Sequence, residues 1–196
     1  MAEKARRLQD SGQTSLFVGK GRKPSARAPD RRVTRTLSAL LKAFIDLLLE
    51  RSYGSVSVAD IVERAGVGRS TFYDHFRNKD EILIASMGWM FSILADSVRP
   101  AAPRAPVDAL VAHFWSNRGL ARAIMAPPTE RKLRRALTAA VDEALASSSS
   151  LDPVARKLAA VRIAAGQLGL LEAWTRGEVT AAADQVAEAI VAIARA

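Results

Sequence analysis

The chain has 196 residues, 49% of them hydrophobic and 25% charged, which is the composition of an ordinary globular protein. It has no cysteine and only two histidines, His75 and His113, which excludes disulfides and thiolate metal sites and leaves little material for any metal centre. The formal net charge is +9.

That charge is unevenly distributed along the chain. Residues 1–79 hold 16 Lys/Arg against 8 Asp/Glu, an excess of +8, whereas residues 80–196 hold 13 against 12, an excess of +1. A basic excess of this kind favours a polyanionic partner, because neutralised phosphates supply most of the sequence-independent affinity for nucleic acid. A solubilising basic tail is the alternative. No apolar run approaches the ~18 residues of a membrane span, and the polar N-terminus lacks the core of a secretory signal, so we expect a cytoplasmic protein that does not enter a membrane.

The first 30 residues are rich in glycine, proline, serine and basic side chains and show no sustained apolar periodicity. This composition predicts a disordered basic arm over residues 1–30. Such an arm either follows a groove of DNA or is simply solvated, and the sequence leaves both interpretations open.

A helix with one wide apolar face is predicted from residue 32 to about residue 51. Its apolar side chains recur at the spacing of a helix, namely Val33, Leu37, Leu40, Leu41, Phe44, Leu47 and Leu48. Gly54 is available for a left-handed cap after it.

Residues 57–79, SVADIVERAGVGRSTFYDHFRNK, predict two short helices joined by a glycine turn. Ser57 and Asp60 have the spacing of a capping box, which starts the first helix at Val58. Gly66 ends it. Phe72 and Phe76 are four residues apart, so both face the core, while the polar residues between them remain for other contacts. The pattern is that of a helix-turn-helix, whose second helix lies in the major groove of DNA.

The rest of the chain predicts only helices, at about 80–98, 107–117, 120–125, 129–146, 153–176 and from about 180 to the C-terminus. No segment has the pattern of a strand. The predicted fold class is therefore all-α with about nine helices. A three-helix DNA-binding domain would occupy residues 31–79, and a helical ligand-binding and dimerisation domain would occupy residues 80–196.

Residues 32–86 resemble the N-terminal domain of the tetracycline-repressor (TetR/AcrR) family of bacterial transcription regulators. The resemblance lies in the amphipathic first helix, SVADIVERAGV, STFYDHF, and the lysine that follows at the start of the fourth helix. It implies DNA contact by eight residues, namely Ser57, Gly68, Arg69, Ser70, Thr71, Tyr73, His75 and Lys79. Two positions depart from the family pattern: Gly68 stands where a capping Ser or Thr is common, and Asp74 stands where a basic or aromatic residue is common.

Within that set, Arg69 has two possible roles. Its guanidinium can donate two hydrogen bonds to guanine O6 and N7, which reads sequence, or it can contact a phosphate, which sets only the register of the protein on DNA. The sequence does not separate these two roles.

The same resemblance implies that the second domain is a helical bundle that binds a small ligand and forms a dimer. The segment LLEAW is similar to part of the family's penultimate helix. A two-fold four-helix interface is predicted from the last two helices, with intramolecular core as the alternative, through Val154, Leu158, Val161, Ala165, Leu168, Val186, Ala189, Ile190 and Ile193.

Flexible methionines and large aromatic side chains suit an adaptable apolar ligand site, although plain core is the alternative. The predicted ligand-lining residues are Met87, Met90, Phe91, Phe114, Trp115, Met125 and Trp174. We expect a hydrophobic or weakly polar small molecule as the effector, and no cofactor or metal.

These features favour a homodimeric transcription regulator, a repressor released from a pseudo-palindromic double-stranded DNA operator by a small, largely hydrophobic ligand. One alternative is a non-specific nucleic-acid-binding protein that uses the basic arm. The other is a small helical enzyme, against which the lack of GxSxG, HExxH and a phosphate-binding glycine loop counts.

Overall fold

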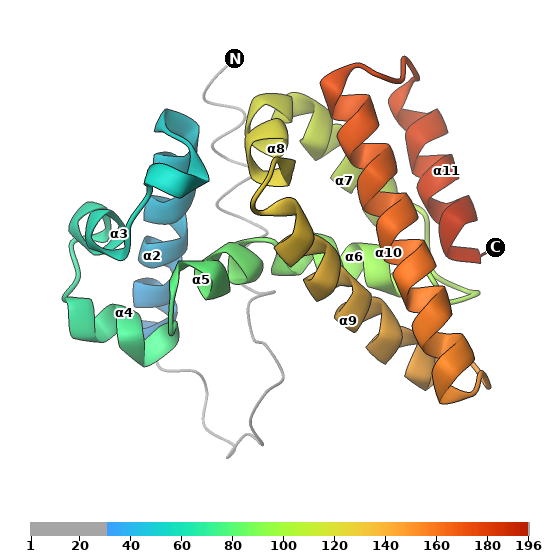
Figure 1. Cartoon of the computed structure of the whole chain (residues 1–196), viewed down its shortest axis with the longest axis horizontal. Coiled ribbons are helices and arrows are strands. Elements are labelled where there is room, and N and C mark those ends of the chain that lie inside the picture. Colours follow the sequence, from blue (N-terminus) through green and yellow to red (C-terminus); the bar gives the residue numbers. More distant parts are fainter. Residues whose placement is uncertain (1–30, 196) are drawn as a thin grey trace. The chain divides into compact units, whose positions relative to one another are not determined.

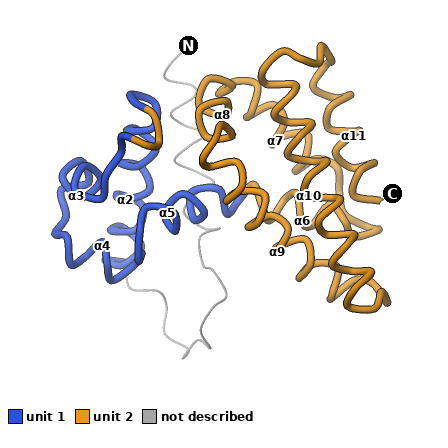
Figure 2. The backbone as a smooth tube through the Cα atoms, viewed as in Figure 1, with its two compact units in different colours: residues 1–51, 55–89 blue, residues 52–54, 90–196 orange. Residues whose placement is uncertain are grey.

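The computed structural model describes residues 31–195, so the predicted arm over residues 1–30 lies outside the described residues. Within residues 31–195, ten α-helices and one short 3-10 helix follow one another without any strand (Figure 1). The predicted all-α class is confirmed. The chain divides into two compact units (Figure 2). Of the described residues, unit 1 takes Arg31–Arg51 and Ser55–Trp89, and unit 2 takes Ser52–Gly54 and Met90–Arg195.

Unit 1 contains four α-helices, which are α2 (Arg31–Glu50), α3 (Val58–Ala65), α4 (Arg69–His75) and α5 (Lys79–Ser86). Their apolar side chains meet in one core, with Leu40, Phe44, Leu47, Ile61, Phe72, Ile82 and Leu83 at 1% exposure or less. After α2 the chain enters the 3-10 helix η1 (Tyr53–Ser55). The prediction of a left-handed cap at Gly54 is therefore wrong, because positive φ angles occur in the described backbone only at Gly66 and Gly177.

Both ends of α3 are set by local chemistry. The Ser57 hydroxyl accepts a hydrogen bond from the Asp60 N–H at 3.2 Å, and the Ser57 N–H donates to the Asp60 carboxylate at 2.7 Å. This capping box, which confirms the prediction, satisfies two N–H groups that helix geometry leaves unpaired. At the other end Gly66 adopts φ 66°, a left-handed conformation that only glycine reaches at little cost.

The helix predicted over residues 80–98 is interrupted in the structure. Helix α5 ends at Ser86, and α6 (Gly88–Asp96) begins two residues later. Between them Met87 has φ −98° and ψ 0°, and its N–H donates to the Ile84 carbonyl at 3.1 Å, three residues back instead of four. Glycine costs about 1 kcal/mol more than alanine inside a helix, which makes Gly88 the weak point of this run. The break accounts for ten helices where about nine were predicted.

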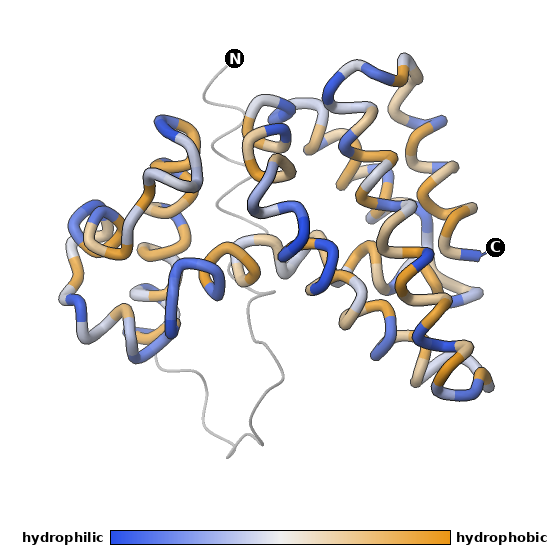
Figure 3. Tube along the Cα trace, viewed as in Figure 1, coloured by the Kyte–Doolittle hydropathy of each residue, from blue (hydrophilic) through white to orange (hydrophobic). Residues whose placement is uncertain are grey.

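Unit 2 is built from α6 and five further helices, which are α7 (Ala105–Ser116), α8 (Arg118–Met125), α9 (Glu130–Ser148), α10 (Pro153–Arg176) and α11 (Ala183–Arg195). Helix α10 packs against α7, α8, α9 and α11. Figure 3 shows hydrophobic and hydrophilic residues alternating along these helices, as expected for helices that each bury one face. None of the helices within the described range is both long enough and apolar enough to cross a membrane.

Two glycines have opposite uses in α10. Gly177, at φ 80°, ends the helix with its N–H directed to the Trp174 carbonyl. Gly166 lies where α10 and α11 approach each other, and a Cβ there would come within 2.9 Å of the Ile193 side chain. The close packing of the last two helices therefore depends on the missing side chain at Gly166.

Candidate nucleic-acid interface

Helix α4 presents a polar face outward because two aromatic side chains anchor its other face. Phe72 and Phe76 are buried, at 0% and 7% exposure, and their ring centroids lie 5.6 Å apart. On the outer face Arg69 and Ser70 are exposed, and Tyr73 is 48% exposed. A second helix of a helix-turn-helix needs this arrangement if its polar side chains are to reach base edges and phosphates.

The most specific geometry on this face joins Arg69 to Tyr73. The Arg69 Cζ lies 5.9 Å from the centroid of the Tyr73 ring, one helical turn away. The Tyr73 ring in turn meets the buried Phe72 ring edge-on, with centroids 5.5 Å apart and planes at 88°. A guanidinium with five N–H donors thus lies beside an aromatic ring that contacts the core.

The remaining residues predicted on α4 differ in exposure. Thr71 and His75 are half-buried, and Gly68 forms the N-cap without any side-chain hydrogen bond. The departure from the family pattern at Gly68 therefore leaves α4 without a side-chain cap. Asp74 is exposed.

Ser57 and Lys79 are engaged in bonds within unit 1. The Ser57 hydroxyl donates to the Asp60 carboxylate at 2.6 Å as part of the cap, and the Lys79 ammonium donates to the Val56 carbonyl at 2.9 Å. Both side chains therefore brace the start of α3, a role that the sequence analysis predicted for Ser57 but not for Lys79.

Two ion pairs hold α3 against the end of α2. Arg64 donates to both carboxylate oxygens of Glu50, and Arg51 lies 3.0 Å from Asp60. The Ser57 hydroxyl and N–H, followed by Arg51, hold the pKa of Asp60 at about 2. The hydrogen bond from Arg64 lowers the pKa of Glu50. Both carboxylates are therefore charged at neutral pH, and the pairs fix the orientation of α3.

Arg77 is a candidate DNA contact that the predicted set omitted. Its side chain is 90% exposed, and its N–H donates to the Glu81 carboxylate at 2.8 Å, just beyond the end of α4. In the sequence, the feature that could have indicated Arg77 is its position as a basic residue four residues after Tyr73. Within residues 31–195, no group of three or more His, Cys, Asp or Glu side chains has the arrangement of metal ligands.

The residues predicted to line a ligand site differ in burial and do not all belong to the same unit. Met90, Phe91, Phe114, Met125 and Trp174 are buried, at 7% exposure or less, within unit 2. Met87 belongs to unit 1, in the break after α5. Trp115 is 46% exposed and stacks on Trp174, with ring centroids 4.7 Å apart.

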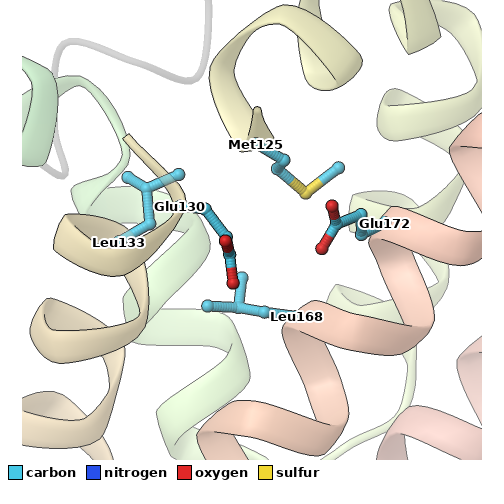
Figure 4. A pocket seen from close by; sticks show the side chains of 5 residues that line it. All are labelled: Met125, Glu130, Leu133, Leu168 and Glu172. Carbon is cyan, nitrogen blue, oxygen red and sulfur yellow. The ribbon is translucent and has the colours of Figure 1, made fainter. Parts of the chain in front are cut away.

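A small pocket in unit 2 contains one member of that set. It is lined by Met125, Glu130, Leu133, Leu168 and Glu172 (Figure 4). Its cavity volume is about 10 Å³, room for about one water molecule, against the roughly 300–1,000 Å³ of ordinary ligand pockets. The sequence analysis did not foresee its two carboxylates, each of which already pairs with an arginine one turn later, Glu130 with Arg134 and Glu172 with Arg176.

The residues predicted at a dimer interface fall into an exposed group and a buried or partly buried group. Four of them form an exposed stripe on α10, spaced four, three and four residues apart, which we name the α10 apolar stripe: Val154, Leu158, Val161 and Ala165. Leu168, Val186 and Ile190 are buried in the core of unit 2, at 7% exposure or less, and Ala189 and Ile193 are partly buried. The buried members have little surface left for a partner.

An all-α chain in which a short helix, a left-handed glycine turn and a second short helix present a polar outer face is a helix-turn-helix protein. Residues 40–86 match the family model of bacterial regulatory proteins, tetR family. The chain is thus similar to this family over its helix-turn-helix region.

The similarity to individual relatives is concentrated in the same region. The uncharacterized HTH-type transcriptional regulator YxbF of Bacillus subtilis (strain 168) is 44% identical over 64 residues, 32% of this chain and 17% of that protein. The HTH-type dhaKLM operon transcriptional activator DhaS of Lactococcus lactis subsp. lactis (strain IL1403) is 39% identical over 56 residues, 29% of this chain and 28% of that protein. The matches thus span less than a third of these relatives.

The fold as a whole is similar to solved structures. A TetR transcriptional regulator from Streptococcus agalactiae 2603V superposes with a TM-score of 0.53 at 21% identity, covering 85% of this chain and 97% of that one. At that identity the likeness concerns the fold alone.

Proposed function

We propose that this chain is a cytoplasmic, homodimeric transcription regulator that binds a specific double-stranded DNA operator through α4 and is released from it by a small, largely hydrophobic ligand. The observation that carries the proposal is the outer face of α4, where Arg69, Ser70 and Tyr73 are exposed while Phe72 is fully buried behind them. The match of residues 40–86 to the tetR family model adds to it, because relatives over this region, such as YxbF, are named as transcriptional regulators.

In the proposed complex, α4 enters the major groove and α3 crosses the phosphate backbone. Arg69 donates to a guanine edge, the contact that specifies sequence. Ser70, Thr71, Tyr73 and His75 donate to phosphates or neighbouring edges, and these contacts set the register of the helix on DNA. Ser57 and Lys79 hold α3 in place and supply secondary contacts.

The α10 apolar stripe supports the dimer. Val154 and Leu158 are 69% and 68% exposed, and Val161 is 49% exposed, so a run of large aliphatic side chains faces outward along one helix. An apolar run of this kind on a water-exposed face commonly marks an interface. A two-fold pair of such faces gives two copies of α4, which suits a pseudo-palindromic operator with half-sites one helical turn, ~34 Å, apart.

The dimer is tested by sedimentation of the full chain at micromolar concentration, with Leu158→Glu as the disruptive variant. We expect a dimer for the wild type and a monomer for the variant. Gln185→Glu, an exposed change on α11 away from the stripe, is the control and should remain dimeric. A monomeric wild type would contradict the proposal.

The pocket between α8, α9 and α10 supports a ligand of largely hydrophobic character. The carboxylates of Glu130 and Glu172 are paired with Arg134 and Arg176. The lining that remains for a ligand is the apolar side chains of Met125, Leu133 and Leu168. The pocket is smaller than a drug-sized molecule, so binding requires it to widen. A ligand that favours the widened state shifts the dimer toward a spacing of recognition helices that no longer fits the operator.

A reporter gene placed behind the operator tests whether the protein represses or activates transcription. A repressor lowers expression of the reporter, and a ligand restores it. DhaS is by name an activator, and reporter expression that rises with this protein would identify an activator here as well.

The experiment that tests DNA recognition is in-vitro selection of DNA bound by the full chain from a random library. We expect an enriched inverted repeat for the wild type and loss of one guanine preference in each half-site for Arg69→Ala. A library that returns no enriched sequence would favour the non-specific alternative, in which the basic arm binds any nucleic acid.

A further inference from the structure

The side chain of Tyr73 has two neighbours that together give it a function of its own. One is the buried Phe72 ring, at 0% exposure, which meets the Tyr73 ring edge-on at 5.5 Å between centroids. The other is the Arg69 guanidinium, 5.9 Å from the ring centroid. The Tyr73 ring therefore touches the buried Phe72 on one side and the Arg69 guanidinium, one helical turn away on the outer face of α4, on the other.

We infer that Tyr73 is a positioning residue for Arg69: its ring holds the guanidinium over the outer face of α4 and thereby sets the preference for guanine in each half-site. This inference rests on the proposed function. It differs from a direct contact of Tyr73 with DNA, because the effect of Tyr73 would pass through the arginine.

The physical basis is the entropy of a long side chain. An exposed arginine loses rotamer freedom when it forms two hydrogen bonds to O6 and N7 of one base, and that loss reduces discrimination between bases. A ring stacked near the guanidinium confines it before DNA binds, and an exposed cation–π contact is worth a two- to fivefold change in an equilibrium constant, about 0.5–1 kcal/mol. The tyrosine hydroxyl takes no part in confining the guanidinium, so a phenylalanine at position 73 should position Arg69 equally well.

Among residues 31–195, no acidic side chain forms an ion pair with Arg69. Asp74 is exposed on the same helix, yet no ion pair joins it to Arg69, and the ion pairs of unit 1 lie elsewhere, at Glu50, Asp60, Asp46 and Glu81. Among the described contacts of Arg69, the ring of Tyr73 is the one that orients it.

The test measures, with the full chain, the affinity for the selected operator and for operators in which each base pair is changed in turn. Arg69→Ala identifies the guanine that Arg69 reads, where the wild type should discriminate by about fivefold or more. At that same base pair, Tyr73→Leu should reduce the discrimination by about two- to fivefold, whereas Tyr73→Phe should keep it. In the Arg69→Ala background, Tyr73→Leu should change the discrimination no further.

Arg77→Ala is the matched control. Removing this exposed cation should weaken binding to all sequences about equally and lower the salt dependence of binding, without changing any base preference. Far-UV circular dichroism and thermal unfolding check that each variant is folded, and Tyr73→Met replaces Tyr73→Leu if the latter is not.

Three results would overturn the inference while leaving the proposed function intact. These are a loss of affinity with Tyr73→Leu that leaves the discrimination at the Arg69 base pair unchanged, a changed preference at a different base pair, and an effect that adds to that of Arg69→Ala. An Arg69→Ala variant that keeps every base preference would overturn it too. Absence of any sequence preference in the wild type would overturn both the inference and the proposed function.

Discussion

Arg64 donates two hydrogen bonds to the carboxylate of Glu50, at 2.7 and 2.8 Å, and so joins the last turn of α3 to the last turn of α2. The two-pronged geometry is the one that guanidinium and carboxylate groups form best. Because α4 follows α3 across a turn of three residues with Gly66 at its start, this pair helps to fix the direction of the recognition helix.

Replacing Arg64 with lysine should therefore lower both the stability of unit 1 and the affinity for the operator. Lysine keeps the charge but cannot form the two parallel bonds. The measurement is the midpoint of urea unfolding at fixed protein concentration, together with DNA affinity.

Lys42→Ala provides the comparison for Arg64→Lys. The Lys42 side chain is 75% exposed, and its pair with Asp46 lies within α2, so its loss should leave both quantities nearly unchanged. Equal effects of the two substitutions would show that the geometry of the Arg64 pair is unimportant.

Asp60 makes the stability of unit 1 sensitive to acid. Its pKa in the folded chain is about 2, below the ordinary value of 3.8, chiefly through the hydrogen bonds from Ser57. A lowered pKa means that the stabilisation is fully present above pH ~4 and is lost as the pH falls through ~2. Urea unfolding between pH 5 and pH 2 should therefore show a loss of stability that Asp60→Asn reduces. An unchanged pH dependence in the variant would contradict the role of this carboxylate.

Phe72 is the fully buried side chain that anchors the recognition helix α4 to the core of unit 1. Phe72→Ala should destabilise unit 1 by about 3–5 kcal/mol, because it leaves a cavity where a fully buried ring stood. Asp74→Ala, on the exposed face of the same helix, should change stability by no more than about 0.5 kcal/mol. The free energy of unfolding measured in urea distinguishes these values. A small effect of Phe72→Ala would mean that α4 is held by other contacts.

Gly166→Ala tests the close packing of α10 and α11. The added Cβ would come within 2.9 Å of the Ile193 side chain, so that side chain or the helices must shift and unit 2 should lose stability. The second substitution Ile193→Ala should restore part of that loss, because it removes the obstructing atom. Gly119→Ala, which adds a Cβ to α8 with no atom within 4 Å, should not destabilise the protein. Thermal unfolding of the wild type and of these three variants gives the comparison.

The sequence predicted the features of unit 1 that depend on neighbouring residues. Ser57 and Asp60 cap α3 because they are three residues apart, and Gly66 takes the left-handed conformation because the chain must turn there. The burial of Phe72 and Phe76 followed from their spacing of four on a helix. The engagement of Lys79 with the Val56 carbonyl was not predictable, because it joins residues 23 positions apart.

Prediction was weaker where several faces of a helix are apolar. In α10, Leu168 and Val161 belong to the same hydrophobic pattern, yet one is buried and the other is 49% exposed. Periodicity does not say which face meets the rest of unit 2 and which is left outside. The break at Met87 was missed for a similar reason, since a glycine within an apolar run weakens a helix without specifying where it ends.

The central claim is sequence-specific binding of DNA through α4, and the ratio of two affinities tests it most directly. The measurement compares, at one fixed salt concentration, the affinity of the full chain for the selected operator with its affinity for random DNA of equal length. Specific regulators prefer their sites by about a thousandfold or more, and we expect a ratio of that order for the wild type and a ratio lower by about fivefold or more for Arg69→Ala. A wild-type ratio near one would contradict the account.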